Sequence, residues 1–345
     1  MWRYSRIPDL DLDRLAPAAV TSTIEHGDLG RATVHRGEDA ATRLDELPEH
    51  ADALQWLHLG LAVDPIVIDV PAGATVSEPI IIRHEGPADG QAIATHLVVN
   101  LGEGSAATVV EQFDGGGAGL VLPGTTVVAQ RGAQAGYASL QRLDPSGWSM
   151  GHLDVVAHQE ASVTAALAGF GGDYARLRTD CRLVGRGASG KLVAAYFGDG
   201  DQTLDYRTFQ EHAAPDTTSN LLFKGVVSDR SRSVYTGLIR VAKEARGTNA
   251  FQTNRNIKLS EDAWAESVPN LQIENNDVHC SHASAVGPID EEQRFYLESR
   301  GVPTRVAERL IVAGFFAEVF DAFPIDDRSN LEAAVAAKLT AVLAA

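Results

Sequence analysis

KLVAAYFGDGDQTLDYRTFQEHAAPDTTSNLLFKGVVSDRSRSVYTGLIRV, residues 191–241, shows a pattern that recurs through most of the chain. The runs Lys191–Phe197, Asn220–Val227 and Ser233–Val241 have the length and the apolar, β-branched composition of strands. Glycine-rich turns separate them and no long helical pattern lies between them, so βαβ units are not expected. Leu192–Ala195 is apolar at every position, which predicts burial on both faces.

Strand-like runs continue on both sides of this stretch, from about residue 65 to about residue 285. The earlier ones are Pro65–Val70, Ile80–Arg83, His96–Leu101, Ala107–Phe113, Thr126–Gln130 and His152–His158. The series is long for a single sandwich, although the pattern alone also allows a sandwich or a barrel. Strands that are apolar on both faces favour a β-solenoid, because one face can line the core while the other packs on a neighbour.

The two flanks differ from this β-rich middle. Residues 1–60 are mixed in character, and one short helix is expected in Arg43–Leu59, interrupted at Pro48. From residue 288 the pattern turns helical. The sequence therefore predicts an N-terminal mixed or helical region (1–60), a β-helix core (61–287) and a C-terminal helical domain (288–345).

The C-terminal region carries signals for helix starts and ends. Asp290 followed by Gln293 fits a capping box, and Gly301 suits the end of that helix. Pro303 suits the first position of a second helix that stops before Pro324. A third helix is expected from about Ser329. Apolar residues recur at helical spacing in the second and third helices: Val306, Leu310, Val312, Phe316, Val319, Phe320, Leu331, Val335, Leu339 and Val342.

The composition excludes several classes of protein. The chain has 345 residues and a formal charge of −17, with no basic stripe, so neither a nucleic-acid partner nor an anionic membrane surface is expected. Two cysteines cannot form a disulfide framework, and no signal-peptide core or membrane-length apolar run is present. These features predict a soluble cytoplasmic protein. The chain has no P-loop motif, so ATP hydrolysis by that route is excluded.

The most distinctive segment for chemistry is Asn270–Gly287, NLQIENNDVHCSHASAVG. In a strand, Cys280 and His282 would share one face and His279 would point the other way. A thiolate beside an imidazole suits iron or zinc, but the pair makes only half of a metal site. A buried structural cysteine and a Cys–His nucleophile are alternatives for the same residues.

Other candidates carry less chemical signal. Cys181 lies about a hundred residues from Cys280, and nothing in the sequence brings the two together. His212 is a weaker ligand candidate in a turn-rich segment, where a structural role is the simpler interpretation. His96 and His152 are expected to be ordinary residues at strand edges. The carboxylates of Glu274, Asp277, Asp290 and Glu291 are read as a solvated face and a helix start.

The segment from His212 to Val319 resembles the SufB/SufD family of iron–sulfur cluster assembly proteins. The matching residues are His212, Pro215, Thr217, Ser219, Lys224, Gln252, Asn254, Leu259, Ser260, Pro269, Asp277, Val278, Cys280, Ser281, His282, Gly287, Asp290, Phe295, Tyr296, Leu297, Ser299, Arg300 and Gly301. Cys-Ser-His followed by Phe-Tyr-Leu-x-Ser-Arg-Gly is the most specific part. Ala283–Gly287 and Gly314–Val319 look more like SufD than SufB, and so does the opening Trp2-Arg3-Tyr4. Upstream helical sequence that family members usually carry is absent here.

The resemblance implies a right-handed parallel β-helix flanked by helical regions, and a non-catalytic scaffold that pairs with SufB. It also implies docking of the SufC ATPase on the C-terminal helices, for which the candidate residues are Phe295, Tyr296, Arg300, Phe315, Phe316 and Val319. A nascent Fe–S cluster would be shared with SufB, with His282 matching the family's proposed ligand and Cys280 its neighbour. Reduced flavin could bind the complex, and no cofactor is expected in the isolated chain, which could form a homodimer.

Three alternatives remain at this point. A SufB-like scaffold would assemble a cluster on its own homodimer. A β-helix carbohydrate-active enzyme would need paired carboxylates or a Ca²⁺ site along a groove, and the aromatic content of 6% offers little platform for sugars. A small metal-binding module would use His279, Cys280 and His282 as a zinc site.

Overall fold

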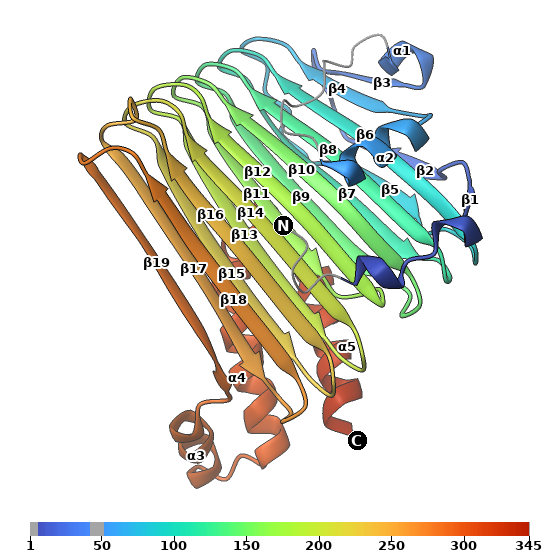
Figure 1. Ribbon diagram of the computed structural model, residues 1–345, viewed down its shortest axis with the longest axis vertical. Helices are drawn as coiled ribbons and strands as arrows, with labels where there is room; N and C mark the ends of the chain where they lie inside the picture. The colour runs from blue at the N-terminus through green and yellow to red at the C-terminus, as the bar shows by residue number, and fades with distance from the viewer. Residues whose placement is uncertain (1–5, 42–51, 345) are drawn as a thin grey trace.

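Two long β-sheets form the body of the molecule and face each other across a narrow interior (Figure 1). The computed structural model describes residues 6–41 and 52–344. The first sheet, sheet A, contains β4 (Ile66–Val70), β6 (Gln91–Leu101), β8 (Leu120–Ala129), β10 (Trp148–Ala157), β12 (Tyr174–Leu183), β14 (Thr203–His212), β16 (Arg232–Val241) and β18 (Trp264–Ile273). Sheet B contains β5 (Ile80–Glu85), β7 (Ala106–Gly115), β9 (Gln134–Leu143), β11 (Ser162–Gly169), β13 (Ser189–Gly198), β15 (Thr218–Val227), β17 (Thr248–Lys258) and β19 (Val278–Pro288).

The chain alternates between the sheets, so that each pair of successive strands makes one coil of a β-solenoid with about eight turns. Within each sheet these strands pair in parallel and in register, as in the row Cys181, Gln210, Ile239, Leu271. The predicted mainly-β solenoid is confirmed. All nine strand-like runs of the sequence lie on strands or overlap them.

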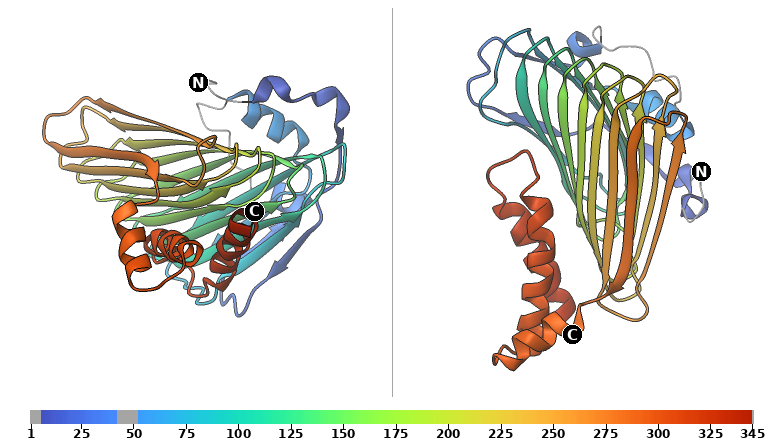
Figure 2. Two further views of the ribbon diagram at one scale, coloured as in Figure 1. Left: turned by 90° about the horizontal axis from the view of Figure 1, so that it is seen from below. Right: turned by 90° about the vertical axis from the view of Figure 1, so that its left-hand side faces the viewer.

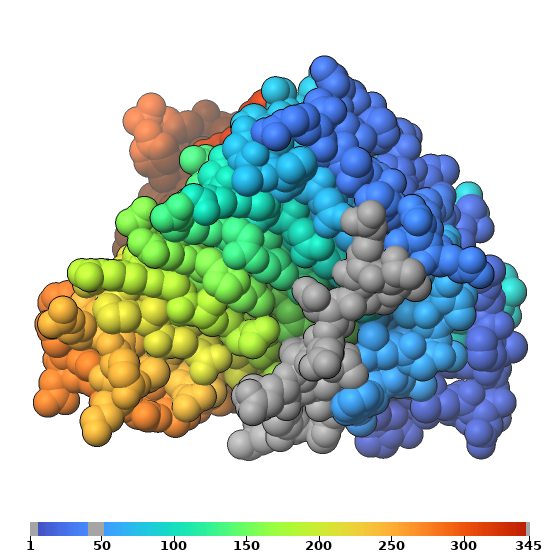
Figure 3. Space-filling view, turned by 90° about the horizontal axis from the view of Figure 1, so that it is seen from above, coloured from blue at the N-terminus to red at the C-terminus, as the bar shows by residue number. Residues whose placement is uncertain are grey.

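The first coil is covered by short antiparallel strands. The strand β3 (Thr33–Arg36) pairs with β4, and β2 (Ser22–Glu25) pairs with β5. The two-residue strand β1 (Ala16–Pro17) joins β6 in parallel, and 3-10 turns at Ile7–Asp9 and Leu12–Arg14 and the short helix α1 (Glu38–Ala41) complete this end. Figure 3 shows these N-terminal segments in blue at one end and the last strands in orange at the other.

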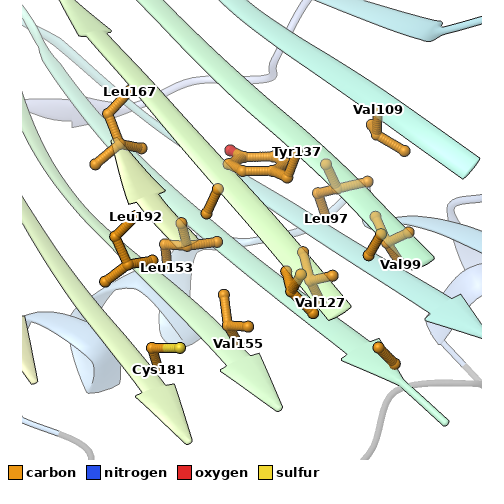
Figure 4. Packing of buried hydrophobic residues seen from close by; sticks show 14 of the residues in the cluster. Leu97, Val99, Val109, Val127, Tyr137, Leu153, Val155, Leu167, Cys181 and Leu192 are labelled. Atoms are coloured by element: carbon orange, nitrogen blue, oxygen red, sulfur yellow. The ribbon is translucent and has the colours of Figure 1, made fainter. Parts of the chain in front are cut away.

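The interior is filled by side chains that alternate along every strand. One face of each strand points into the solenoid, where Leu97, Val127, Leu153 and Tyr137 belong to a continuous apolar core (Figure 4). The other face is also buried along much of the sheets, because helices cover it. This two-sided burial explains why the strands are apolar in consecutive positions rather than in alternate ones.

A helix from each flank covers an outer face. Helix α2 (Ala53–Leu61) lies on sheet A over β6, β8 and β10 and begins at a capping box made by Asp52 and Gln55. It ends two residues later than the predicted helix, and residues 42–51, which include Pro48, lie outside the described part of the chain. Trp2-Arg3-Tyr4 also lies outside it.

The C-terminal helices are α3 (Glu291–Ser299), α4 (Thr304–Phe320) and α5 (Ser329–Ala344). Figure 2 shows them together on one side of the solenoid, where α4 packs on β13 and β15 of sheet B. The Asp290 side chain accepts hydrogen bonds from the backbone N–H groups of Glu292 and Gln293, which confirms the predicted cap. The reciprocal bond of the Gln293 side chain, which a full capping box requires, is not formed. Pro303 is the N-cap of α4, one position before the predicted one. No helix in the described ranges has the length and hydrophobicity needed to span a membrane.

Candidate functional site

The two ends of the solenoid differ, and the end made by β18 and β19 is open. Each of these strands is paired on one side only within the described residues. Leu271 and Ile273 of β18 belong to the rows that line the interior, yet they are 39% and 40% exposed. Unpaired strand edges beside exposed apolar side chains mark a surface suited to pairing with another chain.

Cys280 and His282 lie on β19 at this open end. Cys280 packs with Val278 against Ile239 and Ala250, so its side chain faces the interior. Strand alternation places His282 on the same face and His279 on the outer face, where it is exposed. Burial raises the pKa of the Cys280 thiol, while a backbone hydrogen bond at Ala250 acts in the opposite direction.

This pair is an incomplete ligand set. Within residues 6–41 and 52–344, no group of three or more His, Cys, Asp or Glu side chains is placed to hold a metal ion. Cys181 does not complete the set, because it sits on β12, three coils away, or ~14 Å along the solenoid at ~4.8 Å per strand. It is buried, and burial raises the pKa of its thiol to about 12.

His212 is a buried structural residue of the interior. Its Nδ1 lies 2.8 Å from Thr217 Oγ1 and its Nε2 lies 2.8 Å from Ser219 Oγ, so both ring nitrogens are already engaged. Burial lowers the pKa of this imidazole to about 4, which keeps it neutral at ordinary pH. It lies two coils from His282, and the structure does not bring the two together.

The interior of the last coils combines a small apolar cluster around Ile239 and Ala250 with several buried amides on β17. Asn254 Nδ2 donates to Tyr196 Oη at 3.0 Å, and that hydroxyl donates to Asn256 Oδ1 at 2.9 Å. Gln252 is 1% exposed, and neither atom of its amide has a hydrogen-bond partner in the described structure. In the sequence, Gln252 and Asn254 stand out only as residues that match the SufB/SufD family. Their positions two apart on one strand are the signal that they share a face.

The C-terminal helices offer a second surface. A groove of about 1050 Å³ runs between the ends of β17 and β19 and the helices α3 and α4, and it is lined by Arg255, Val286, Tyr296, Leu297, Leu310 and Phe315, among others. Phe295 and Tyr296 are 71% and 57% exposed, and Arg300 lies over the Tyr296 ring at 5.1 Å. These residues are accessible to a partner.

Phe316 and Val319 do not lie on that surface, which corrects their place among the docking residues. Both are fully buried in the cluster that joins α4 to sheet B, against Val193, Val226 and their neighbours. Phe315 is partly buried and packs on Lys224. The apolar stripe of α4 is therefore mostly core of the chain itself, with Val306 and Leu310 as its exposed part.

A buried histidine cluster was missed by the sequence analysis. His58 of α2 inserts between His96 and His152, with ring centroids at 5.1 Å and 4.8 Å. Gly124 makes room for it, because a Cβ there would lie 2.2 Å from the His58 ring. His96 and His152 are therefore not ordinary strand-edge residues. They sit on β6 and β10 on either side of Gly124, and strand pairing alone could have found the row.

A second polar cluster lies inside the first coils. The buried carboxylate of Glu111 accepts hydrogen bonds from Tyr137 at 2.6 Å and Thr125 at 2.8 Å. Its other oxygen lies 3.0 Å from His84 Nε2, and His84 Nδ1 lies 2.7 Å from Ser22 Oγ. All of these groups are satisfied by one another, so the cluster stabilises the fold.

The carboxylates considered in the sequence form no catalytic pair. Glu274 and Asp277 are exposed or partly exposed in the turn between β18 and β19. Asp290 caps α3, and Glu291 lies in the first turn of that helix, where a negative charge is favourable.

Comparison with known proteins agrees with these features. A family model described as SUF system FeS cluster assembly, SufBD core domain, matches residues 82–315. An iron–sulfur cluster assembly SufBD family protein of Mycobacterium tuberculosis is 32% identical, over 97% of this chain and 87% of its own length. The iron–sulfur cluster assembly protein SufD of Escherichia coli is 31% identical over 85% and 72%, and that of Bacillus subtilis 26% identical over 79% and 63%.

Proposed function

Because the chain belongs to the SufBD family of iron–sulfur cluster assembly proteins, we propose that it is a SufD-type scaffold subunit, acting in the cytoplasm with a SufB partner and a SufC ATPase. The partner strands would pair with the edges of β18 and β19. The unpaired edges and the exposed Leu271 and Ile273 support this place for the junction.

The single observation that carries the proposal is the position of His282. It lies at the open end of the solenoid, faces the interior, and has Cys280 as its only neighbouring ligand candidate on that face of the strand. One imidazole and one thiol cannot enclose an iron–sulfur cluster, which usually takes four protein ligands. A partner that supplies the missing ligands would make a shared site, in which the cluster is the cargo and not a resident group.

The ATPase would dock on the helical region. The exposed Phe295 and Tyr296, with the groove beside them, provide an apolar surface with Arg300 at its edge. The helix beside this surface, α4, is joined to sheet B by Lys224. Lys224 of β15 lies 2.6 Å from Glu318 of α4 and donates to the Phe315 carbonyl at 2.7 Å. The Lys224 ammonium lowers the pKa of the Glu318 carboxyl.

That connection supports a mechanical role for ATP. When two ATPase subunits close, they would pull on the C-terminal helices of both scaffold chains. Because α4 is anchored in the outer core of sheet B, the displacement would reach the open end and expose the shared site. Such coupling requires the ATPase to bind the two arrangements with different affinity.

The test is anaerobic co-expression with the cognate SufB and SufC, followed by iron and sulfide determination in the purified complex. We expect His282→Ala to leave the complex intact and to reduce its iron and sulfide content severalfold. His279→Ala is the matched control, since that imidazole lies on the outer face of the same strand. If the complex forms and both variants keep wild-type content, the ligand role is wrong. If no complex forms with the wild-type chain, the scaffold role fails.

The open end also favours a second candidate, a homodimer that assembles a cluster by itself. A second copy would present the same edges and the same His282 across a two-fold axis. Anaerobic purification of the chain alone decides between the two. A coloured dimer with bound iron and sulfide would support the homodimeric scaffold, whereas a colourless chain that acquires iron only with SufB would support the heterodimer.

A further inference from the structure

Gln252 is an unusual residue for the interior of a solenoid. Its side chain is 1% exposed, and both its Nε2 and its Oε1 lack a hydrogen-bond partner in the described part of the chain. Buried amides are nearly always paired, because an unpaired one has lost its hydrogen bonds to water without replacement. Its neighbours Asn254 and Asn256 follow this rule through Tyr196. The exception therefore points to a role that the isolated chain does not fulfil.

The strand register places Gln252 beside His282. The two residues are direct partners on β17 and β19, whose backbones lie ~4.8 Å apart. The row of Ala250 and Cys280 next to them faces the interior, and strand alternation puts Gln252 and His282 on that same side. Gln252 thus lies on the last strand of sheet B that is paired on both sides, and His282 is its neighbour in register on the final strand.

The local backbone makes room for the amide. A Cβ at position 237 would lie 2.4 Å from Gln252 Nε2 and 2.5 Å from Tyr235 Oη, so the glycine leaves space for both side-chain ends in their present positions. Gly237 lies on β16, across the interior from β17, and closes that side of the amide. On its own sheet, Gln252 lies between β15 and β19, and β19 is the strand on the side of the open end.

We propose that Gln252 is the positioning residue of His282. When a partner covers the open end, its amide oxygen accepts a hydrogen bond from one ring nitrogen of His282. This fixes the tautomer and the ring plane, and it leaves the other nitrogen to bind the iron of the cargo. Histidines that bind metals commonly donate their second ring N–H to an oxygen in this way.

This inference rests on the proposed ligand role of His282 and is separable from it. The test uses the complex with SufB and SufC, prepared anaerobically from a chain labelled with ¹⁵N-histidine. Two quantities are measured: iron and sulfide per complex, and the ¹⁵N hyperfine couplings of the reduced cluster by pulsed electron paramagnetic resonance. The variants are Gln252→Leu, which removes the acceptor, and Gln252→Glu, which keeps an acceptor in the same place. Gln272→Leu is the control, since Gln272 is an exposed amide in the last coil.

We expect Gln252→Leu to retain iron roughly tenfold less tightly and to give altered or heterogeneous histidine couplings, as loss of a ligand's supporting partner does. Gln252→Glu should restore retention, and Gln272→Leu should match the wild type. Wild-type content and couplings in Gln252→Leu would overturn the inference. Should that variant fail to assemble, Gln252→Glu decides through the couplings, because a carboxylate that accepts the hydrogen bond makes the imidazole more basic than an amide does. Retained iron with changed couplings supports the inference, and couplings identical to those of the wild type contradict it. A proposed function that is itself wrong shows separately, because His282→Ala then changes nothing.

Discussion

The coils around β8 to β11 and the last two coils share one backbone geometry but have different interiors. In the former, Val127, Leu153 and Leu167 fill the interior (Figure 4), both sheet edges are paired, and helices cover the outer faces. In the latter, the buried amides of Gln252, Asn254 and Asn256 lie beside a small apolar cluster around Ile239 and Ala250, and the final strands have free edges. Apolar burial stabilises the former region, whereas the latter keeps the unpaired amide of Gln252 and the exposed Leu271 and Ile273, which favour association with another chain. Along the solenoid, the middle coils therefore contribute most to stability, while the last coils carry the surface suited to binding another chain.

The largest expected effect lies in the aliphatic interior. Leu153→Ala should lower the free energy of unfolding by about 2–5 kcal/mol, because it leaves a cavity among closely packed strands. Leu271 also faces the interior, but it lies at the open end and is partly exposed. Leu271→Ala should therefore lower the free energy of unfolding of the isolated chain by less than about 1 kcal/mol. Denaturant unfolding of both variants measures the difference. If both variants lose the same free energy of unfolding, the open end is as tightly packed as the middle coils, and the proposed difference between the two regions is wrong.

An effect of intermediate size is expected on the pH dependence of stability, through the histidine cluster between α2 and sheet A. Burial lowers the pKa values of His58, His96 and His152, and that of His96 falls to about 4. The unfolded chain binds protons near pH 6.5, so acidification favours unfolding. The stability that neutral His96 contributes is complete above pH 6.5 and is lost as the pH falls toward 4, up to about 3 kcal/mol. Burial also raises the pKa of Asp154 to about 7, which acts in the opposite sense because its contribution is lost as the pH rises through 7.

Unfolding free energies measured at several pH values between 7 and 4.5 test this. His96→Gln should flatten the decline toward acid, while His26→Gln, at an exposed site, should leave the slope as in the wild type. An unchanged slope in His96→Gln would mean that the ring is not kept neutral by burial. Asp154→Asn removes the opposing effect of this carboxyl on the pH dependence of the free energy of unfolding, so it measures that effect separately.

The smallest effect distinguishes the two thiols. Cys181 is buried and its pKa is raised to about 12, so it should resist alkylation, whereas Cys280 is half-buried at the open end. We expect one thiol per native chain to react with a maleimide, two after denaturation, and none in Cys280→Ser under native conditions. A partner on the open end should protect Cys280. Rapid labelling of Cys181 would show that the middle coils open more readily than their packing implies.

Much of the fold could be predicted from the sequence because strands buried on both faces leave a strong apolar signal. The number of coils could not, since their length varies. Leu153 and its partner Thr179 are 26 residues apart, whereas Gly237 and its partner Pro269 are 32 apart, so no fixed repeat exists to count. The strands β9, β11, β12, β14, β17 and β18 match none of the predicted runs. In β12 and β14, arginine and aspartate lie on the outer face, where Arg178 pairs with Asp52 at the start of α2 and Arg207 pairs with Asp205.

The candidate site was only partly visible in the sequence. A Cys-x-His on a strand predicts a shared face, and the structure has that strand. What periodicity could not give is the register between β17 and β19, which brings Gln252 beside His282 across 30 positions of sequence. Nor could it separate Phe316 and Val319 from Phe295 and Tyr296, because helical spacing does not tell which apolar face meets the chain's own sheet.

The antiparallel strands β2 and β3 make the two ends of the solenoid different. They are four residues each and end the two sheets beyond the first coil, where short edges discourage further pairing. Among the described residues, only the opposite end has long free strands, so we expect copies of the molecule to join through these edges in pairs. A stack of parallel coils is otherwise the geometry of a fibril. In this molecule one end of the stack is closed by the short strands β2 and β3, so we expect assembly through the sheets to stop at two molecules.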